Sequence, residues 1–267
     1  KTFFSNNITP VLNNYNQFER WTSYIKVNFN RPLMLHVDTG MNRLGFQKLD
    51  IEKLKKNRKK LEQFKNVTVM SHLACADDKT NKFNLEQKKS LDLFKKDFPK
   101  CKYSLAASGG IFLGKKYHYD MVRPGISLYG GKRTFHKKIK HAVALKAPII
   151  QINKIKKGES IGYSRTYFAK QNTITATISV GYADGMNIRL SNKGYFHFKK
   201  KKVSIIGRVS MDLIILDITK FKNKIKVGDY IDIYNKNYTI DDFAKQSGTI
   251  PYRIITCMSS RYDKKYI

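Results

Sequence analysis

The sequence predicts an α/β first half followed by a mainly-β second half. Residues 31–130 alternate short apolar, strand-like segments with helix-like segments, which is typical of a parallel sheet whose strands are joined by helices. Residues 143–234 contain further strand-like segments with little helical periodicity between them. Because the pattern changes near the basic stretch 131–141, we expect one domain at 1–137 and a second at 138–267.

The predicted strands of the first half are short apolar runs, and two of them end at polar residues. They are Leu33–Val37, Val67–Met70, Tyr103–Ala106 and Tyr119–Val122. One basic helix is expected between the first two, with its apolar face at Ile51, Leu54, Leu61 and Phe64. Another is expected after Asn84, whose side chain would cap it with Gln87 three residues on. Its apolar face would be Leu91, Phe94 and Phe98, and Pro99 would end it.

The second half contains strand-like segments and one segment with a helical pattern. The strands are predicted at Val143–Ile155, Thr173–Val180, Val203–Ile206, Leu213–Asp217 and Tyr230–Tyr234, and the helix at Thr239–Gln246.

The chain carries 52 Lys and Arg against 20 Asp and Glu, a formal net charge of +32. Such a charge suggests a nucleic-acid partner. However, the basic residues are spread over many segments, and the chain is also rich in Asn, Ile, Tyr and Phe, whose codons, like those of Lys, are A/T-rich. We therefore interpret the charge as compositional drift on solvated faces and expect no nucleic-acid partner. Steep salt dependence of DNA binding would favour the alternative.

The three cysteines form no CxxC pair, and an odd number argues against a disulfide framework. This usage suits a reducing, cytoplasmic setting, and we expect no metal site. No apolar stretch is long enough for a membrane span, and the first residues are too few and too polar for a signal peptide.

Unusual residues follow the predicted strands of the first half. In a (β/α) barrel, the chemistry lies where strands end. Arg43, His72, Ser108 and Arg123 all fall at such positions. Each has a structural alternative: Arg43 as a surface charge, His72 as a core histidine, Ser108 as part of a turn, and Arg123 as part of an ion pair. Their common placement favours a site.

Six motifs make the pattern specific: DTGMNRLGF, SHLACADD, RPGISLYG, GYADG, GRVSMD and YRIITCMSSR. Their order and spacing resemble those of the alanine racemases. This resemblance implies a pyridoxal-phosphate-binding (β/α) TIM-type barrel, here partial, followed by a mainly-β domain that contributes to the partner's active site in a homodimer. It also implies an isomerase that interconverts L- and D-alanine and supplies D-alanine for peptidoglycan. A racemase of serine or another small amino acid, and a non-catalytic pseudoenzyme, remain alternatives.

The resemblance also implies roles for individual residues. The phosphate of the cofactor would be bound by Ser108, Gly125, Ile126 and Tyr252. Arg123 would donate a hydrogen bond to the pyridine nitrogen, and because arginine stays protonated it would not transfer a proton to the ring. The ring is then a weaker electron sink than a pyridinium.

Among the catalytic residues that the family implies, Tyr182 would be one of two bases, and His72 would link Arg123 to it by hydrogen bonds. A tyrosine in water holds its proton at neutral pH, so this base needs nearby positive charge or hydrogen bonds. Arg43 and Met211 would contact the substrate, and Asp212 would support the loop of Met211.

The chain departs from the family pattern in three places. The Schiff-base lysine of the family lies in a motif like KANAYGHG, which is absent from these residues. We therefore expect a partial barrel that is inactive alone, and a lysine motif encoded in frame upstream of Lys1. His36 replaces a lysine that can be carbamylated, and Ala107 replaces the asparagine that commonly precedes the phosphate-binding serine.

Overall fold

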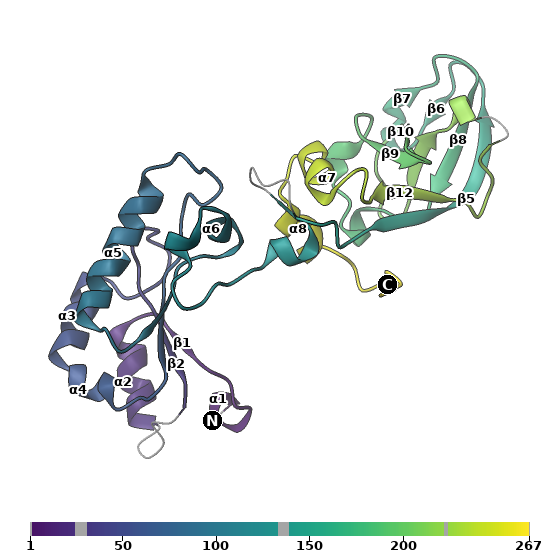
Figure 1. The fold of residues 1–267 in the computed structure, drawn as a ribbon. Coiled ribbons are helices and arrows are strands. Elements are labelled where there is room, and N and C mark those ends of the chain that lie inside the picture. The colour runs from purple at the N-terminus through teal and green to yellow at the C-terminus, as the bar shows by residue number, and fades with distance from the viewer. Residues whose placement is uncertain (1, 25–30, 133–138, 222–223, 267) are drawn as a thin grey trace. The chain divides into compact units, whose positions relative to one another are not determined.

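The structure is a computed structural model that describes residues 2–24, 31–132, 139–221 and 224–266. Its described residues form two compact units, one ending at Gly125 and the other starting at Ile126 (Figure 1). The predicted boundary between residues 137 and 138 lies outside the described residues.

The first unit is built on a parallel sheet in the strand order β1-β2-β3-β4. The strands are β1 (Val11–Leu12), β2 (Leu33–His36), β3 (Val67–Met70) and β4 (Lys102–Ser104). Met34 pairs with Val11 on one side and with Thr68 on the other. The parallel sheet predicted from the alternating pattern is therefore confirmed, and its described strands form an open sheet.

Four helices connect these strands: α2 (Tyr15–Tyr24), α3 (Lys48–Lys56), α4 (Arg58–Glu62) and α5 (Phe83–Asp97). Helix α1 (Thr2–Ser5) precedes β1, and α6 (Ser108–Phe112) follows β4. Helices α3, α4 and α5 lie along the same side of the sheet in Figure 1. Leu35 and Val69 of the sheet are fully buried with Leu54, Leu61 and Leu91 of these helices. The opposite face carries the half-buried Met34, Thr68 and Met70.

Two predicted elements of the first unit differ in the structure. The basic helix is interrupted at Asn57, where α3 ends and α4 begins. Segment 119–122 forms no strand, because Tyr119 adopts a left-handed φ of 51° and only Arg123 bridges to Ala107. A left-handed residue breaks the extended backbone that a strand needs.

The second unit is a closed antiparallel barrel in the strand order β10-β11-β8-β5-β12-β9. Its strands are β5 (Leu145–Ile155), β8 (Thr173–Ile178), β9 (Tyr195–Phe198), β10 (Lys201–Ile205), β11 (Ile214–Asp217) and β12 (Tyr230–Tyr234). A separate hairpin joins β6 (Ser160–Ile161) to β7 (Tyr167–Phe168). All five predicted strands are present, whereas β6, β7 and β9 were not predicted.

Two helices accompany this barrel. The predicted one is α7 (Ile240–Gln246), which Thr239 caps by accepting a hydrogen bond from the Asp242 N–H. Its Phe243 packs against Phe196 in the barrel core. The other, α8 (Pro251–Thr256), was not predicted, because six residues are too few to show a helical period.

Short 3-10 turns complete the described chain: η1 (Lys115–Tyr117), η2 (Ile126–Tyr129), η3 (Tyr163–Arg165), η4 (Tyr182–Asp184), η5 (Ile188–Leu190) and η6 (Thr219–Phe221). The longest described helix is α5 with 15 residues, and none combines the length and the apolar character that a bilayer span requires. Cys75, Cys101 and Cys257 are free thiols.

Candidate active site

The carboxyl ends of the parallel strands bring polar side chains to one edge of the first unit's sheet. His36 ends β2, Ser71 and His72 follow β3, and Ser104 ends β4. Parallel strands all end on the same side, and in (β/α) folds this side carries the binding and catalytic residues. The arrangement agrees with the site position predicted from the sequence.

Arg123 crosses this edge and is fixed by several acceptors. Its Nη1 donates to Ser104 Oγ, and its Nη2 donates to the Ser71 carbonyl at 2.6 Å. The same Nη2 lies 3.5 Å from Nδ1 of His72. Burial lowers the pKa of Arg123, yet a guanidinium titrates so high that it keeps its charge. The site therefore contains a rigid cation in contact with a histidine.

Burial and positive charge hold the histidines of this edge in the neutral form. Burial, followed by the charges of Arg123, Arg43 and His36, lowers the pKa of His72 to about 4. The pKa of His36 is also lowered, chiefly by burial, and its Nδ1 lies 3.0 Å from Asn13 Oδ1. Since Arg43 acts on both histidines, its charge belongs to the same cluster. At neutral pH, His72 can accept a hydrogen bond from Arg123.

The stability of the first unit should depend on pH through these histidines. An unfolded histidine titrates near ~6.5. Below this pH, the unfolded chain therefore binds a proton that the folded His72 does not bind until about pH 4. We expect the free energy of unfolding to be greatest above this value and to fall as the pH drops from about 6.5 to about 4. Urea unfolding followed by fluorescence of Trp21, the single tryptophan, measures this. His72→Gln should flatten the dependence, and an unchanged slope would contradict the assignment.

Gln87 of α5 forms hydrogen bonds with the backbone of the loop that carries His72. Its amide is completely buried, and Nε2 donates to the His72 carbonyl at 2.9 Å and to Thr39 Oγ1 at 3.2 Å. Its Oε1 accepts the Ala74 N–H at 2.8 Å. The predicted capping box at Asn84 is thus wrong: α5 begins at Phe83, and Gln87 makes tertiary rather than capping hydrogen bonds.

Replacing Gln87 with leucine should destabilise the first unit by about 2–4 kcal/mol, because the change leaves buried donors and acceptors without partners. Urea unfolding monitored by Trp21 fluorescence measures this difference. The matched control is Gln63→Leu, an exposed glutamine at the end of α4, for which we expect less than about 0.5 kcal/mol. Equal effects for the two variants would show that the Gln87 hydrogen bonds contribute little.

Ser108 and Gly125 form a second polar group in the first unit. Ser108 is 4% exposed, and its hydroxyl accepts the Gly125 N–H at 2.7 Å. A Cβ built on Gly125 would meet no atom nearer than this hydroxyl, at 3.7 Å, so the space beside the glycine is open. A hydroxyl that accepts one hydrogen bond can still donate its own proton, and a phosphate group requires such donors. These residues therefore fit a phosphorylated cofactor.

Tyr182 and Met211 lie on adjacent loops of the second unit. The Tyr182 N–H donates to the Ser210 carbonyl and the Ala183 N–H to the Met211 carbonyl, both at 3.0 Å. Both side chains remain exposed, Tyr182 by 42% and Met211 by 53%. The backbone of these loops is fixed while their side chains are available to a ligand or another molecule.

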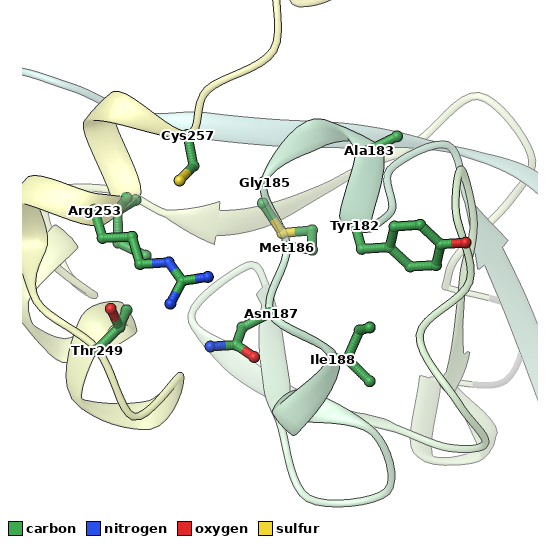
Figure 2. A pocket seen from close by; sticks show the side chains of 10 residues that line it. Tyr182, Ala183, Gly185, Met186, Asn187, Ile188, Thr249, Arg253 and Cys257 are labelled. Atoms are coloured by element: carbon green, nitrogen blue, oxygen red, sulfur yellow. The ribbon is translucent and has the colours of Figure 1, made fainter.

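A cavity of about 420 Å³ opens between the Tyr182 loop and α8. Tyr182, Asn187, Thr249, Arg253 and Cys257 are among its lining residues (Figure 2). Arg253 extends toward Met186 and Asn187, whereas the ring of Tyr182 points away from Arg253. The phenol hydroxyl is therefore not directed at this arginine.

Ile126 and the start of α8 are neighbours in the second unit. A Cβ built on Gly131 would lie 2.6 Å from Ile126 Cγ1 and 3.2 Å from Pro251 Cβ. Ile126 is buried, whereas Tyr252, the next residue of α8, is 40% exposed. Both predicted phosphate-binding residues of this unit thus lie in one region.

The predicted site residues are divided between the two units. Those in the first are Arg43, His72, Ser108, Arg123 and Gly125, and those in the second are Ile126, Tyr182, Met211 and Tyr252. Within the units, the structure brings together His72 with Arg123, Ser108 with Gly125, and the loops of Tyr182 and Met211. Two residues that were not predicted also hold segments of the candidate site. Gln87 donates to the His72 carbonyl in the first unit, and Arg261 donates to Asp184 and Asp212 in the second.

Comparison with known proteins matches both halves of the chain to one family. Residues 1–133 match the family model "Alanine racemase, N-terminal domain", and residues 142–266 match "Alanine racemase, C-terminal domain". The chain belongs to the alanine racemase family. Its resemblance to that family, seen in the motifs, is thereby confirmed, as is the fold class of a racemase barrel domain followed by a mainly-β domain.

Individual alanine racemases agree with this assignment. The chain is 41% identical to alanine racemase of Rickettsia bellii over 265 residues, covering 97% of this chain and 65% of that protein. It is 40% identical to that of Rickettsia canadensis, covering 97% of this chain and 73% of the relative. The chain thus spans about two thirds to three quarters of the length of these relatives.

A solved structure gives the same result. Alanine racemase from Bartonella henselae, solved with covalently bound pyridoxal phosphate, matches with a TM-score of 0.94 and 35% identity. The match covers 100% of this chain and 75% of the Bartonella chain.

Proposed function

We propose that the protein containing this chain interconverts L- and D-alanine with pyridoxal phosphate, as a cytoplasmic homodimer that supplies D-alanine for peptidoglycan. Family membership supports the reaction. The observation that carries the proposal is the cluster of His72, Arg123 and Ser104 at the carboxyl edge of the sheet. Ser108, whose hydroxyl accepts the Gly125 N–H, lies in the same unit and would donate its own proton to the phosphate.

Five of the predicted residues are proposed to hold the cofactor. Ser108, Gly125, Ile126 and Tyr252 bind the phosphate in this proposal, and Arg123 donates to the pyridine nitrogen. When bound, pyridoxal phosphate withdraws electrons from the substrate Cα, so that its proton can leave. The hydrogen-bond acceptors around Arg123 fix the position of its guanidinium. The neutral His72 beside it can accept a hydrogen bond from Arg123 through one ring nitrogen and donate one from the other.

Tyr182 is the proposed base for one face of Cα. Its exposed side chain on a fixed backbone suits a residue that enters the site of a second copy, as the proposed homodimer requires. Arg43 would bind the substrate carboxylate, because its guanidinium offers a planar set of donors, and Met211 would contact the substrate beside Tyr182. The base for the opposite face would be the family's lysine, whose motif is absent from these 267 residues.

The proposal is tested with two proteins: the 267-residue chain alone, and the same chain expressed with the codons in frame upstream of Lys1. Each is incubated with pyridoxal phosphate and L-alanine, and D-alanine is measured by chiral chromatography. We expect D-alanine from the longer protein only, and a cofactor-dependent rise in melting temperature for both. Racemisation of serine but not alanine by the longer protein would favour the alternative substrate. Cofactor binding without any racemisation would favour the pseudoenzyme.

A further inference from the structure

The C-terminal segment contacts both loops that carry Tyr182 and Met211. Nε and Nη2 of Arg261 lie 3.0 and 2.8 Å from Asp184 Oδ1, and Nη1 lies 2.8 Å from Asp212 Oδ1. Asp184 lies two residues after Tyr182, and Asp212 directly follows Met211. One guanidinium therefore joins the two loops that hold the proposed base and a proposed substrate contact.

The contacts around Asp184 continue directly into the Tyr182 loop. The Asp184 side chain is 9% exposed, and its Oδ2 accepts the Gly181 N–H at 2.9 Å. Its backbone carbonyl accepts the hydroxyl of Tyr262 at 2.7 Å. Arg261 is itself 51% exposed, so removing it would leave the buried carboxylate with its Gly181 N–H bond and with water in place of the guanidinium.

We propose that Arg261 is a positioning residue that fixes the backbone of the Tyr182 loop relative to the Met211 loop through Asp184 and Asp212. The guanidinium can bind two carboxylates at once because its donors form a rigid planar fork. The bridge adds side-chain contacts to the two backbone hydrogen bonds that join the loops directly, from Tyr182 to Ser210 and from Ala183 to Met211. The inference rests on the proposed role of Tyr182 but concerns a structural relation that exists without cofactor or substrate.

Hydrogen exchange followed by mass spectrometry tests the bridge without requiring activity. The amides of Gly181, Tyr182 and Ala183 are protected by bonds to Asp184, Ser210 and Met211. In Arg261→Gln we expect these amides to exchange about tenfold faster, while β8 and β11 keep their protection. The exchange rates in Arg261→Lys should lie between those of the wild type and Arg261→Gln, since an ammonium keeps the charge but lacks the planar fork. The matched control is Lys264→Gln, which removes one positive charge from the same exposed segment and should change nothing.

Steady-state kinetics on the longer protein give the second readout. We expect Arg261→Gln to lower kcat about tenfold with a smaller change in KM, and Arg261→Lys to recover part of this loss. Unchanged exchange in the Tyr182 loop would overturn the proposal, and so would faster exchange throughout the barrel, which would make Arg261 a general stabiliser. If the wild-type protein does not racemise alanine, the proposed function fails, whereas the exchange result still decides whether Arg261 bridges the loops.

Discussion

Replacing Tyr182 with phenylalanine is expected to lower D-alanine formation by about 10²- to 10⁴-fold, the usual contribution of a positioned acid or base. The substitution removes only the phenol oxygen. The backbone bonds of residues 182 and 183 to the Ser210 and Met211 carbonyls do not involve the side chain, so the loop should keep its structure. Initial rates from L-alanine and from D-alanine, measured on the longer protein, give the effect in each direction.

The matched control is Tyr230→Phe, another exposed tyrosine of the second unit, whose ring lies near the Lys146 ammonium. This variant should keep the wild-type rate. Tyr182→Phe should also bind pyridoxal phosphate as tightly as the wild type, because Tyr182 is not among the proposed phosphate ligands. A Tyr182→Phe protein with full activity would contradict its assignment as a base.

Replacing Gly181 with alanine is expected to destabilise the second unit by about 3 kcal/mol or more. Gly181 has a φ of −150°, so its backbone conformation is open to any residue. The obstacle is contact: a Cβ would lie 2.1 Å from the Met211 carbonyl oxygen and 2.5 Å from the Asp212 N. These are backbone atoms that cannot rotate away, so the two loops must separate. Urea unfolding, monitored by hydrogen exchange of the β8 and β11 amides, measures the decrease in the free energy of unfolding.

Gly158→Ala is the control for this prediction. Gly158 has a left-handed φ of 86°, but a Cβ there would meet no atom within 4 Å. Gly158→Ala should therefore lower the free energy of unfolding only by the about 1–2 kcal/mol that a Cβ costs in the left-handed conformation. If Gly181→Ala were no more destabilising than Gly158→Ala, the close approach of the Tyr182 and Met211 loops would not be as the structure shows.

The fold was predictable where local pattern and tertiary environment agree. Apolar runs such as Val67–Met70 identify buried strands, and the alternation with helices identifies a parallel sheet. Prediction failed where a single backbone conformation decides the outcome. Neither the helix boundary at Asn57 nor the left-handed φ of Tyr119 has a periodic signal in the sequence.

The candidate site divides in the same way. The motifs identified the residues at the strand ends, because their chemistry is unusual for those positions. Gln87 was assigned to a cap because a capping box is a local pattern, whereas its hydrogen bonds reach residues 13 to 48 positions away. Arg261 offered one usable signal: it is a cation in the last motif, while Asp184 and Asp212 are acidic residues in two other motifs.

Exchange of the substrate Cα hydrogen tests the central proposal most directly. The longer protein is incubated with pyridoxal phosphate and L-alanine in deuterium oxide, and the Cα hydrogen is followed by NMR while the enantiomers are separated by chiral chromatography. The account predicts deuterium at Cα in the newly formed D-alanine and a final mixture with equal amounts of both enantiomers, since these have equal free energies. It also predicts that Tyr182→Phe forms deuterated D-alanine about 10²- to 10⁴-fold more slowly. Complete retention of the Cα hydrogen in the wild-type protein, with the cofactor bound, would contradict it.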